Sequence, residues 1–299
     1  MEHQNNFLND NQEPSDNEKI SNNDIRIVPN SQIFNKSNSE QIKVNFYRAL
    51  IIFILGWIGL SIIYSIVVDV GKSFGYVIDY VNDPTNSYII NSNYQLIAYG
   101  ILFVTLIIAV LAPAFKENFK KIIQGYNKIE TYAKGLIFAV ILLAWQIIYG
   151  LITTAIFGDI SSNANQVSLT VLFKHNPVAI FLVAVFLAPI CEEFTYRYAL
   201  FGGIRSLGAN NKYNKLFTIL AFVLTALIFG LIHFDFDAFT TGGDALKIEL
   251  INLPNYIGAG LILCYAYYHS ESLITSILVH FINNLYSIIG MLIAMSGGN

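Results

Sequence analysis

Long apolar stretches alternate with short polar connections from about residue 49 to the C-terminus. A helix needs about 20 mostly apolar residues to cross the roughly 30 Å hydrocarbon core of a bilayer. Candidate stretches lie near residues 49–68, 94–114, 135–157, 178–201, 216–234, 255–268 and 272–293. The pattern therefore predicts an all-α membrane protein, a polytopic bundle of about seven transmembrane helices.

The sixth apolar stretch is short, and its boundaries predict a tight helical hairpin with the seventh. Pro254 marks its expected start, and residues 269–271 alone separate it from the next stretch. A further segment, residues 70–90, combines Gly71 and Gly75 with scattered aromatic side chains. An interfacial helix is one interpretation of that segment, which periodicity alone does not decide.

The N-terminal residues differ from the rest of the chain in composition. Residues 1–43 hold ten asparagines and few large apolar side chains, so they cannot bury enough surface to offset the entropy of ordering, and we predict a disordered tail. The first apolar core begins near Ala49, too far along the chain for a cleavable signal peptide. We divide the chain into this tail, N-terminal transmembrane helices over residues 44–128, and a core over residues 129–299.

Charge indicates both the partner and the orientation. Only 12% of the residues are charged, against about 25% in soluble domains, and no basic face suits a phosphate backbone. We therefore expect a lipid bilayer as partner and no nucleic acid. The N-terminal segment through Arg48 contains five lysines and arginines, and the connections after it alternate between few and many of them. The successive connections contain one, five, one, four and one. This alternation predicts a cytoplasmic N-terminus in a multi-pass protein of the cell membrane.

Three charges follow an apolar run in the stretch LAPICEEFTYRYALFGG. A charge at the centre of a spanning helix costs about 2.5–3.5 kcal/mol on insertion scales, so such residues indicate function. Glu193 and Arg197 share a helix face, which predicts an ion pair, whereas Glu192 is rotated by about 100° and can face a cavity. Pro189 lacks a backbone donor, and we expect it to free the carbonyl of Val185 and to kink the helix.

Two further polar pairs lie on later apolar stretches. The sequence FGLIH places Phe229 and His233 one turn apart, and HFINN places His280 and Asn284 one turn apart. A carboxylate with a histidine can hold and deprotonate a water molecule, and a histidine with an amide can donate hydrogen bonds to an oxyanion. The three sets together favour hydrolysis of an amide bond without a protein nucleophile.

These motifs resemble EExxxR, FxxxH and HxxxN of the CPBP intramembrane proteases, also called the CAAX protease and bacteriocin-processing or Abi family. The resemblance covers roughly residues 130–293. It implies a glutamate-dependent membrane endopeptidase with Glu192 as general base, His233 orienting the water, and His280 with Asn284 forming an oxyanion hole. Supporting roles at the site fall to the other motif residues, Glu193, Arg197 and Phe229.

The motifs leave the cofactor open. HExxH is absent, so a zincin-type helix is excluded. We favour a mechanism without a cofactor. The alternative is zinc held by two histidines and a carboxylate with an open fourth position, namely Glu192, His233 and His280.

The substrate implied by the resemblance is a peptide or small protein in the membrane, such as a CAAX protein or the precursor of a bacteriocin or pheromone, with self-immunity as a related role. Two other classes of function stay open: a non-catalytic membrane immunity or scaffold protein, and a proton-coupled transporter. Substitution of Glu192 separates them, because a scaffold would keep its phenotype. The sequence does not indicate an oligomeric state.

The depths of the motif residues conflict in a simple count. At about 1.5 Å per residue, Glu192 and His280 come to a similar depth, whereas His233 comes out roughly 25 Å from the cytoplasmic side. The count therefore predicts that the fifth helix enters the membrane later than its neighbours or tilts strongly.

Overall fold

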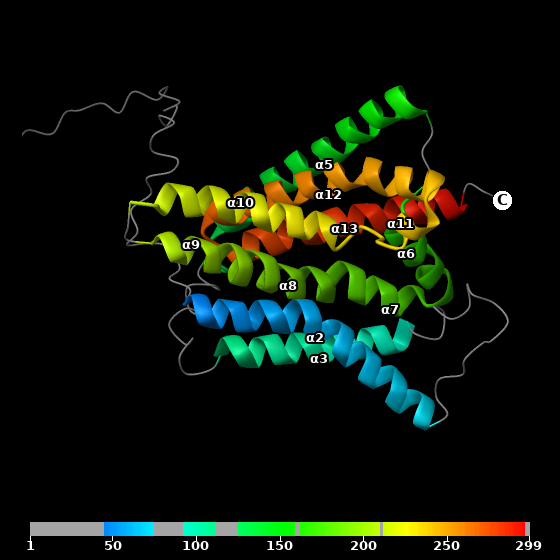
Figure 1. Cartoon of the computed structure of the whole chain (residues 1–299), viewed down its shortest axis with the longest axis horizontal. Coiled ribbons are helices and arrows are strands. Elements are labelled where there is room, and N and C mark those ends of the chain that lie inside the picture. The colour runs from blue at the N-terminus through cyan, green and yellow to red at the C-terminus, as the bar shows by residue number, and fades with distance from the viewer. Residues whose placement is uncertain (1–44, 75–91, 112–124, 159–161, 210–211, 297–299) are drawn as a thin grey trace, which may run out of the picture. The chain divides into compact units, whose positions relative to one another are not determined.

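Helices make up most of the described chain, and none of the described residues forms a β-strand. The computed structural model describes residues 45–74, 92–111, 125–158, 162–209 and 212–296 (Figure 1). All of them belong to one compact unit that runs from Ser37 to the C-terminus. The predicted tail, residues 1–43, and residues 75–90 of the proposed interfacial segment lie outside the described residues.

The N-terminal part of this unit contains α2 (Phe46–Ser73), α3 (Ser92–Leu111) and α5 (Ile129–Phe157). The side chain of Asn45 caps α2 by accepting hydrogen bonds from the backbone N–H groups of Tyr47 at 3.1 Å and Arg48 at 3.4 Å. These donors lie in the first turn, where a helix supplies no backbone acceptor. α2 and α3 lie side by side (Figure 1).

A continuous helical rod from Pro177 to Gly208 carries the two glutamates. Its geometry changes between α and π along its length, in the order α7 (Pro177–Phe181), η3 (Leu182–Leu187), α8 (Ala188–Glu192), η4 (Glu193–Phe201) and α9 (Gly202–Gly208). π-helical turns are rare in proteins and are frequent at functional sites. Here the two π-helical segments, η3 and η4, flank the short α-helical segment that contains Pro189 and Glu192.

The remaining helices are α6 (Ala164–His175), α10 (Asn214–Leu231), α11 (Ala238–Thr241), α12 (Gly243–Ser270) and α13 (Leu273–Ser296). The tight hairpin between the last two helices is confirmed. Glu271 adopts a left-handed conformation, with φ 55°, directly after α12. This conformation ends the helix and lets the chain reverse within two residues.

The prediction that the sixth span begins at Pro254 is wrong, because α12 begins well before it and contains the proline. Two side chains of α5 donate hydrogen bonds to the backbone on either side of it. The Tyr149 hydroxyl reaches the carbonyl of Ile251 at 2.6 Å, and the Trp145 indole reaches that of Asn255 at 3.2 Å. Donors from neighbouring helices allow a transmembrane helix to contain proline.

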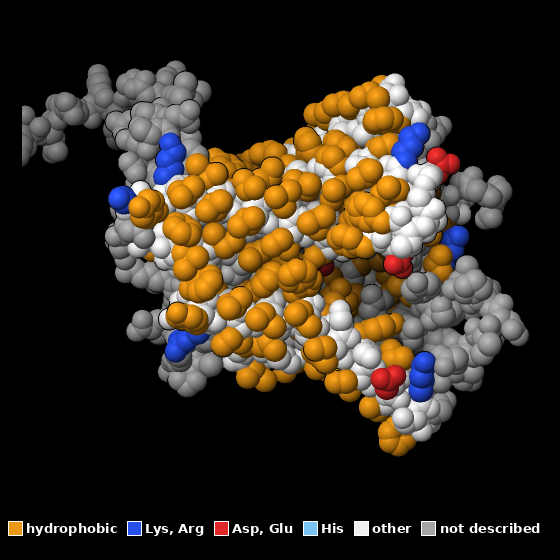
Figure 2. Space-filling model, in the orientation of Figure 1, with side chains coloured by type: hydrophobic (Ala, Val, Ile, Leu, Met, Phe, Trp, Pro, Cys, Tyr) orange, Lys and Arg blue, Asp and Glu red, His pale blue; other side chains and the backbone are white. Residues whose placement is uncertain are grey.

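Six described helices are long and apolar enough to cross a membrane: α2, α5, the rod of residues 177–208, α10, α12 and α13. A shorter apolar helix, Leu96–Ala109, lies within α3. Hydrophobic side chains cover much of the face in Figure 2, and most of the lysines and arginines seen there lie toward its two ends. The chain is therefore a multi-pass membrane protein, and the predicted polytopic helical bundle is confirmed.

A glycine lets α2 approach the rod closely. A Cβ atom at Gly56 would overlap the side chain of Thr195 in η4. The Thr195 hydroxyl is already committed to the carbonyl of Cys191, at 2.7 Å. Small residues at helix crossings permit such backbone approach in membranes. α2 therefore packs directly on the helix that carries Glu192, although it lies outside the motif region.

We expect Gly56→Val to lower the unfolding temperature of the detergent-solubilised protein, because overpacking a close contact costs about 1–3 kcal/mol. Gly100→Val is the matched control, since a Cβ there meets no heavy atom within 4 Å. Thermal unfolding of both variants and the wild type measures the effect. Equal unfolding temperatures for the two variants would contradict the close contact between α2 and η4.

Candidate active site

A buried ion pair forms the centre of the site. The Arg197 guanidinium lies 3.1 Å from Oε1 of Glu193, one turn earlier on the rod, and both side chains are fully buried. The guanidinium also stacks on the ring of Phe229, with 4.3 Å from its central carbon to the ring centroid. The predicted pair is therefore present, and a cation–π contact from α10 adds to it.

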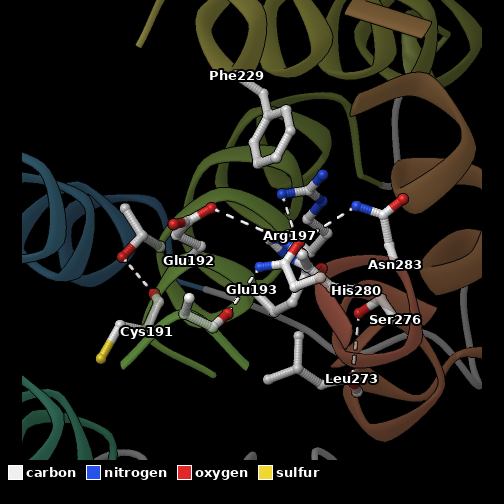
Figure 3. Close-up of polar contacts among 12 residues, drawn as sticks. Cys191, Glu192, Glu193, Arg197, Phe229, Leu273, Ser276, His280 and Asn283 are labelled. Carbon is white, nitrogen blue, oxygen red and sulfur yellow. Dashed lines mark hydrogen bonds and ion pairs between the residues drawn. The ribbon is translucent and has the colours of Figure 1, made fainter. Parts of the chain in front are cut away.

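The pair extends to α13 through a histidine (Figure 3). Nδ1 of His280 lies 2.8 Å from Oε1 of Glu193. A carboxylate ionised by its arginine can only accept, so Nδ1 carries the hydrogen and donates it. This hydrogen bond sets the orientation of the imidazole ring and leaves Nε2 for other partners.

Glu192 lies on the other side of that imidazole. Its Oε2 is 3.8 Å from Nε2 of His280, and 20% of its side-chain surface is accessible, against none for Glu193. A separation of 3.8 Å is too long for a hydrogen bond, and an oxygen that bonds to both atoms would lie beside the line between them. The two adjacent glutamates therefore differ as predicted: Glu193 is paired and buried, and Glu192 faces a cavity.

Asn284 compensates for Pro189. In η3 the N–H of Ala188 bonds to the carbonyl of Val183, five residues earlier. The next such bond would join residue 189 to the carbonyl of Ala184, but proline has no N–H. The side-chain amide of Asn284 donates to that carbonyl instead, at 2.8 Å. The expectation that Pro189 frees the carbonyl of Val185 is therefore wrong, because the π-helical register moves the vacancy to Ala184.

This contact occupies one of the two N–H groups of the Asn284 amide, and its Oδ1 accepts from Asn283 at 3.2 Å. The proposed oxyanion role of Asn284 stays a prediction. The structure gives the residue a further function, which is to hold α13 against the π-helical turn before Glu192.

His233 faces the same cavity as Glu192 and His280. Its Nδ1 lies 2.8 Å from the carbonyl of Phe229, and its ring stacks on Tyr256 with centroids 4.6 Å apart. A carbonyl only accepts, so Nδ1 donates and Nε2 is the nitrogen left for a ligand.

Two features bring His233 to the depth of the other motif residues. The π-helical turns of η3 advance less per residue than α-helical ones, so Glu192 lies nearer to Pro177 than a uniform count gives. The start of α10 and the turn between α12 and α13 lie at the same end of the bundle, and α10 begins further out than that turn (Figure 1). The later entry of the fifth helix into the membrane stays a prediction.

Buried polar contacts hold the loop that follows His233. Glu249 of α12 is almost fully buried and accepts from the backbone N–H of Ala164 at 2.9 Å and of Asp235 at 3.2 Å. Asn163 is also buried, and its side chain reaches the carbonyl of His233 at 3.5 Å. These contacts join the start of α6, the loop and α12 around the histidine.

Two cavities meet at Glu192 and His233, which line both. The first has a volume of about 530 Å³ and is walled mainly by apolar side chains of α2, α3, the rod and α10. The second, of about 370 Å³, is walled largely by amide and hydroxyl groups. Figure 2 shows a hollow in this face with an acidic side chain inside it.

Sequence reasoning missed several residues at the site. Tyr99 of α3 lines both cavities, and Tyr256 and Asn283 line the second. None of these belongs to a motif whose spacing points to the site. Asn283 alone carried a signal, since it stands next to Asn284 in the sequence.

The zinc alternative stays a prediction. Among the described residues, no three His, Cys, Asp or Glu side chains lie together in a group that could hold a metal ion. Nδ1 of His280 is engaged by Glu193, and its Nε2 is 3.8 Å from Glu192. A carboxylate on Nδ1 is also the usual partner of a histidine that binds a metal through Nε2, so these contacts leave the set of Glu192, His233 and His280 as a prediction, and we derive no step through a metal.

Similarity to known proteins points to a family. Residues 174–286 match the family model of the type II CAAX prenyl endopeptidase Rce1-like proteins. The membrane-embedded CAAX protease MroQ of Staphylococcus aureus (strain USA300) is 23% identical over 203 residues, which is 65% of this chain and 75% of that protein. The matched region is therefore that of a CPBP-type intramembrane protease. Both similarities support a membrane endopeptidase.

A second relative of this chain is an uncharacterized protein of Mycoplasma capricolum subsp. capricolum (strain California kid). It is 26% identical over 178 residues, which is 54% of this chain and 48% of that protein. The chain thus spans about half the length of this relative. No solved structure matches the chain. The region matched to the family contains all of the motif residues, whereas α2 and α3, which wall the first cavity, lie outside it.

Replacing Asn284 with Leu should lower the free energy of unfolding by about 1–3 kcal/mol, because the buried carbonyl of Ala184 loses its donor. Adding Pro189→Ala should restore much of this loss, since residue 189 then supplies an N–H. Thermal unfolding of the two single variants and the double variant tests the coupling. Additive effects in the double variant would show that Asn284 does not compensate for the proline.

Replacing Arg197 with Met should destabilise the CPBP core by about 3–5 kcal/mol, because it leaves Glu193 buried without its partner. The double change Glu193→Gln with Arg197→Met removes both charges and should be less destabilising than Arg197→Met alone. Unfolding in denaturant measures both variants. A double variant less stable than the single one would contradict the pairing.

Proposed function

We propose that this endopeptidase hydrolyses a peptide bond of a small membrane-associated protein or peptide precursor, with Glu192 as the general base. One observation carries the proposal. The Glu192 carboxylate lies where the two cavities meet, with Nε2 of the oriented His280 at 3.8 Å. A base and a hydrogen-bond donor this close together can both reach a water and a carbonyl placed beside them in the cavity.

In the proposed reaction Glu192 takes a proton from a water, whose oxygen attacks the carbonyl carbon of the scissile bond. The carbonyl oxygen becomes an oxyanion and accepts a hydrogen bond from Nε2–H of His280. His233 orients the water through its free Nε2. When the C–N bond breaks, Glu192 returns the proton to the leaving amine, so that the products are a carboxylic acid and an amine.

The proposed reaction also sets the charges of the cluster. In it His280 is an imidazolium that pairs with Glu193 through Nδ1, at 2.8 Å, and faces the oxyanion with Nε2. Arg197 and protonated His280 then balance the two glutamates. Such a neutral buried set lowers the cost of keeping charges within the membrane. The reaction as proposed needs no metal ion.

For the substrate we propose a peptide precursor, such as a bacteriocin or pheromone, or a protein linked to self-immunity. Support comes from the relatives, one described as a CAAX prenyl endopeptidase family and one as a membrane-embedded CAAX protease. We further propose that the protein resides in the cell membrane with a cytoplasmic N-terminus. The basic residues at the start of α2 and around the turn between α9 and α10 support that orientation.

Glu192→Gln should reduce cleavage by about 10²–10⁴-fold, because the amide cannot accept a proton from water. The unfolding temperature should change little, since this carboxylate has no salt bridge shorter than 3.8 Å. Released peptides from cells that carry each form, measured by mass spectrometry, provide the readout.

The matched control is Glu130→Gln, on the exposed start of α5, which should leave cleavage unchanged. Undiminished cleavage by Glu192→Gln at equal protein levels would refute the assignment of the base. A phenotype that persists in that variant without any cleavage would favour the scaffold function.

A further inference from the structure

The second cavity is lined by an unusual concentration of side-chain amides. They come from four separate helices and the segment before α6, and six of them are Gln146, Asn163, Asn165, Asn252, Asn255 and Asn283. Glu192 is the single acid among the described residues of its wall, and that wall contains no lysine or arginine. We call this cavity the amide chamber.

Two of the amides in the amide chamber have an acceptor without a donor. Oδ1 of Asn255 and Oδ1 of Asn283 are buried and have no hydrogen-bond partner among the described residues. They come from α12 and α13, two helices that both follow Glu192 in the chain. Buried polar atoms of this kind are costly unless a ligand or water supplies the missing hydrogen bond.

The other cavity has a different chemistry. Its wall is mainly apolar and includes Trp57 and Leu60 of α2, Leu102 of α3 and Ile228 of α10. It meets the amide chamber at Glu192 and His233. A peptide whose scissile bond lies at Glu192 would therefore extend into an apolar cavity on one side and an amide-lined cavity on the other.

We propose that the amide chamber binds a polar, uncharged stretch of the substrate on one side of the scissile bond, while the apolar cavity receives an apolar side chain on the other side. The inference rests on the proposed function. Each residue of an extended peptide offers one N–H and one C=O, and a side-chain amide supplies both a donor and an acceptor. Apart from Glu192 and the two histidines, the described wall offers no charged partner, so a charged residue among the amides would be desolvated without one and the site discriminates against it.

The test uses purified full-length protein and a set of quenched fluorescent peptides in detergent micelles. The peptides differ at single positions on either side of the cleaved bond, which carry Asn, Lys, Glu or Leu. For the wild type we expect Asn to be preferred over Lys and Glu by roughly tenfold in kcat/KM on one side only, and Leu to be preferred on the other.

Asn255→Asp places an acid in the chamber and should raise kcat/KM for a Lys-containing peptide by roughly tenfold on that same side. Asn283→Asp is a second variant with the same expected direction. The matched control is Asn214→Asp. Asn214 is the first residue of α10, at the end of that helix away from His233, so this change should leave the preferences of the wild type unchanged. Fluorescence anisotropy measures how tightly the same peptides bind to the Glu192→Gln protein, and so reports the residue preference of the chamber without cleavage.

The outcomes separate the inference from the proposed function. If the wild type cleaves charged and uncharged peptides equally on both sides, the amide chamber is not the binding site and the hydrolytic function stands. If both aspartate variants keep the wild-type preferences while folded, the chamber is likewise excluded. If the wild type cleaves none of the peptides, and Glu192→Gln binds none, the proposed function and the inference both fail.

Discussion

The fully buried pair of Glu193 and Arg197 is the constraint on which the rest of the site depends. Two charges inside a membrane protein are stable only when they are paired and further compensated. Phe229 covers the guanidinium from α10, and His280 donates to the carboxylate from α13. The pair thereby joins three helices and fixes the imidazole.

The orientation of Glu192 follows from the same pair. Once Glu193 faces inward toward Arg197, the carboxylate of the preceding residue, Glu192, points to another face of the helix. That face lies where an apolar and an amide-lined cavity meet. One adjacent glutamate is therefore structural, and the other is available for chemistry.

The irregular backbone around Pro189 is part of the same arrangement. Wide turns in η3 shift its hydrogen bonds by one residue, and the carbonyl of Ala184 then lacks a donor that Asn284 supplies. A residue of the HxxxN motif thus stabilises the backbone just before Glu192. This role connects two motifs through a hydrogen bond that would exist without any substrate.

The sequence was sufficient where the determinant was local. Apolar length predicted the spans, and helical spacing predicted both the ion pair and the separate orientation of Glu192. It failed for α12, because the side chains that donate hydrogen bonds to the backbone around Pro254 come from α5, more than a hundred residues away. It also failed for the carbonyl freed by Pro189, because α-helical register was assumed in a π-helical segment.

The residues missed by sequence reasoning share one property, which is that tertiary contacts alone bring them to the site. Tyr99 lies on a helix outside the motif region, and Glu249 acts through backbone groups of Ala164 and Asp235. The amides of the second cavity are ordinary polar residues in the sequence. Their convergence depends on how α5, α6, α12 and α13 pack around Glu192.

A structure of the Glu192→Gln protein with an uncleaved peptide tests the central claim most directly. The account predicts that the scissile carbonyl lies within hydrogen-bond distance of His280, next to the side chain of residue 192. The peptide should continue from the apolar cavity into the amide-lined one. A peptide bound with its scissile bond away from residue 192 would contradict the assignment of Glu192 as the base.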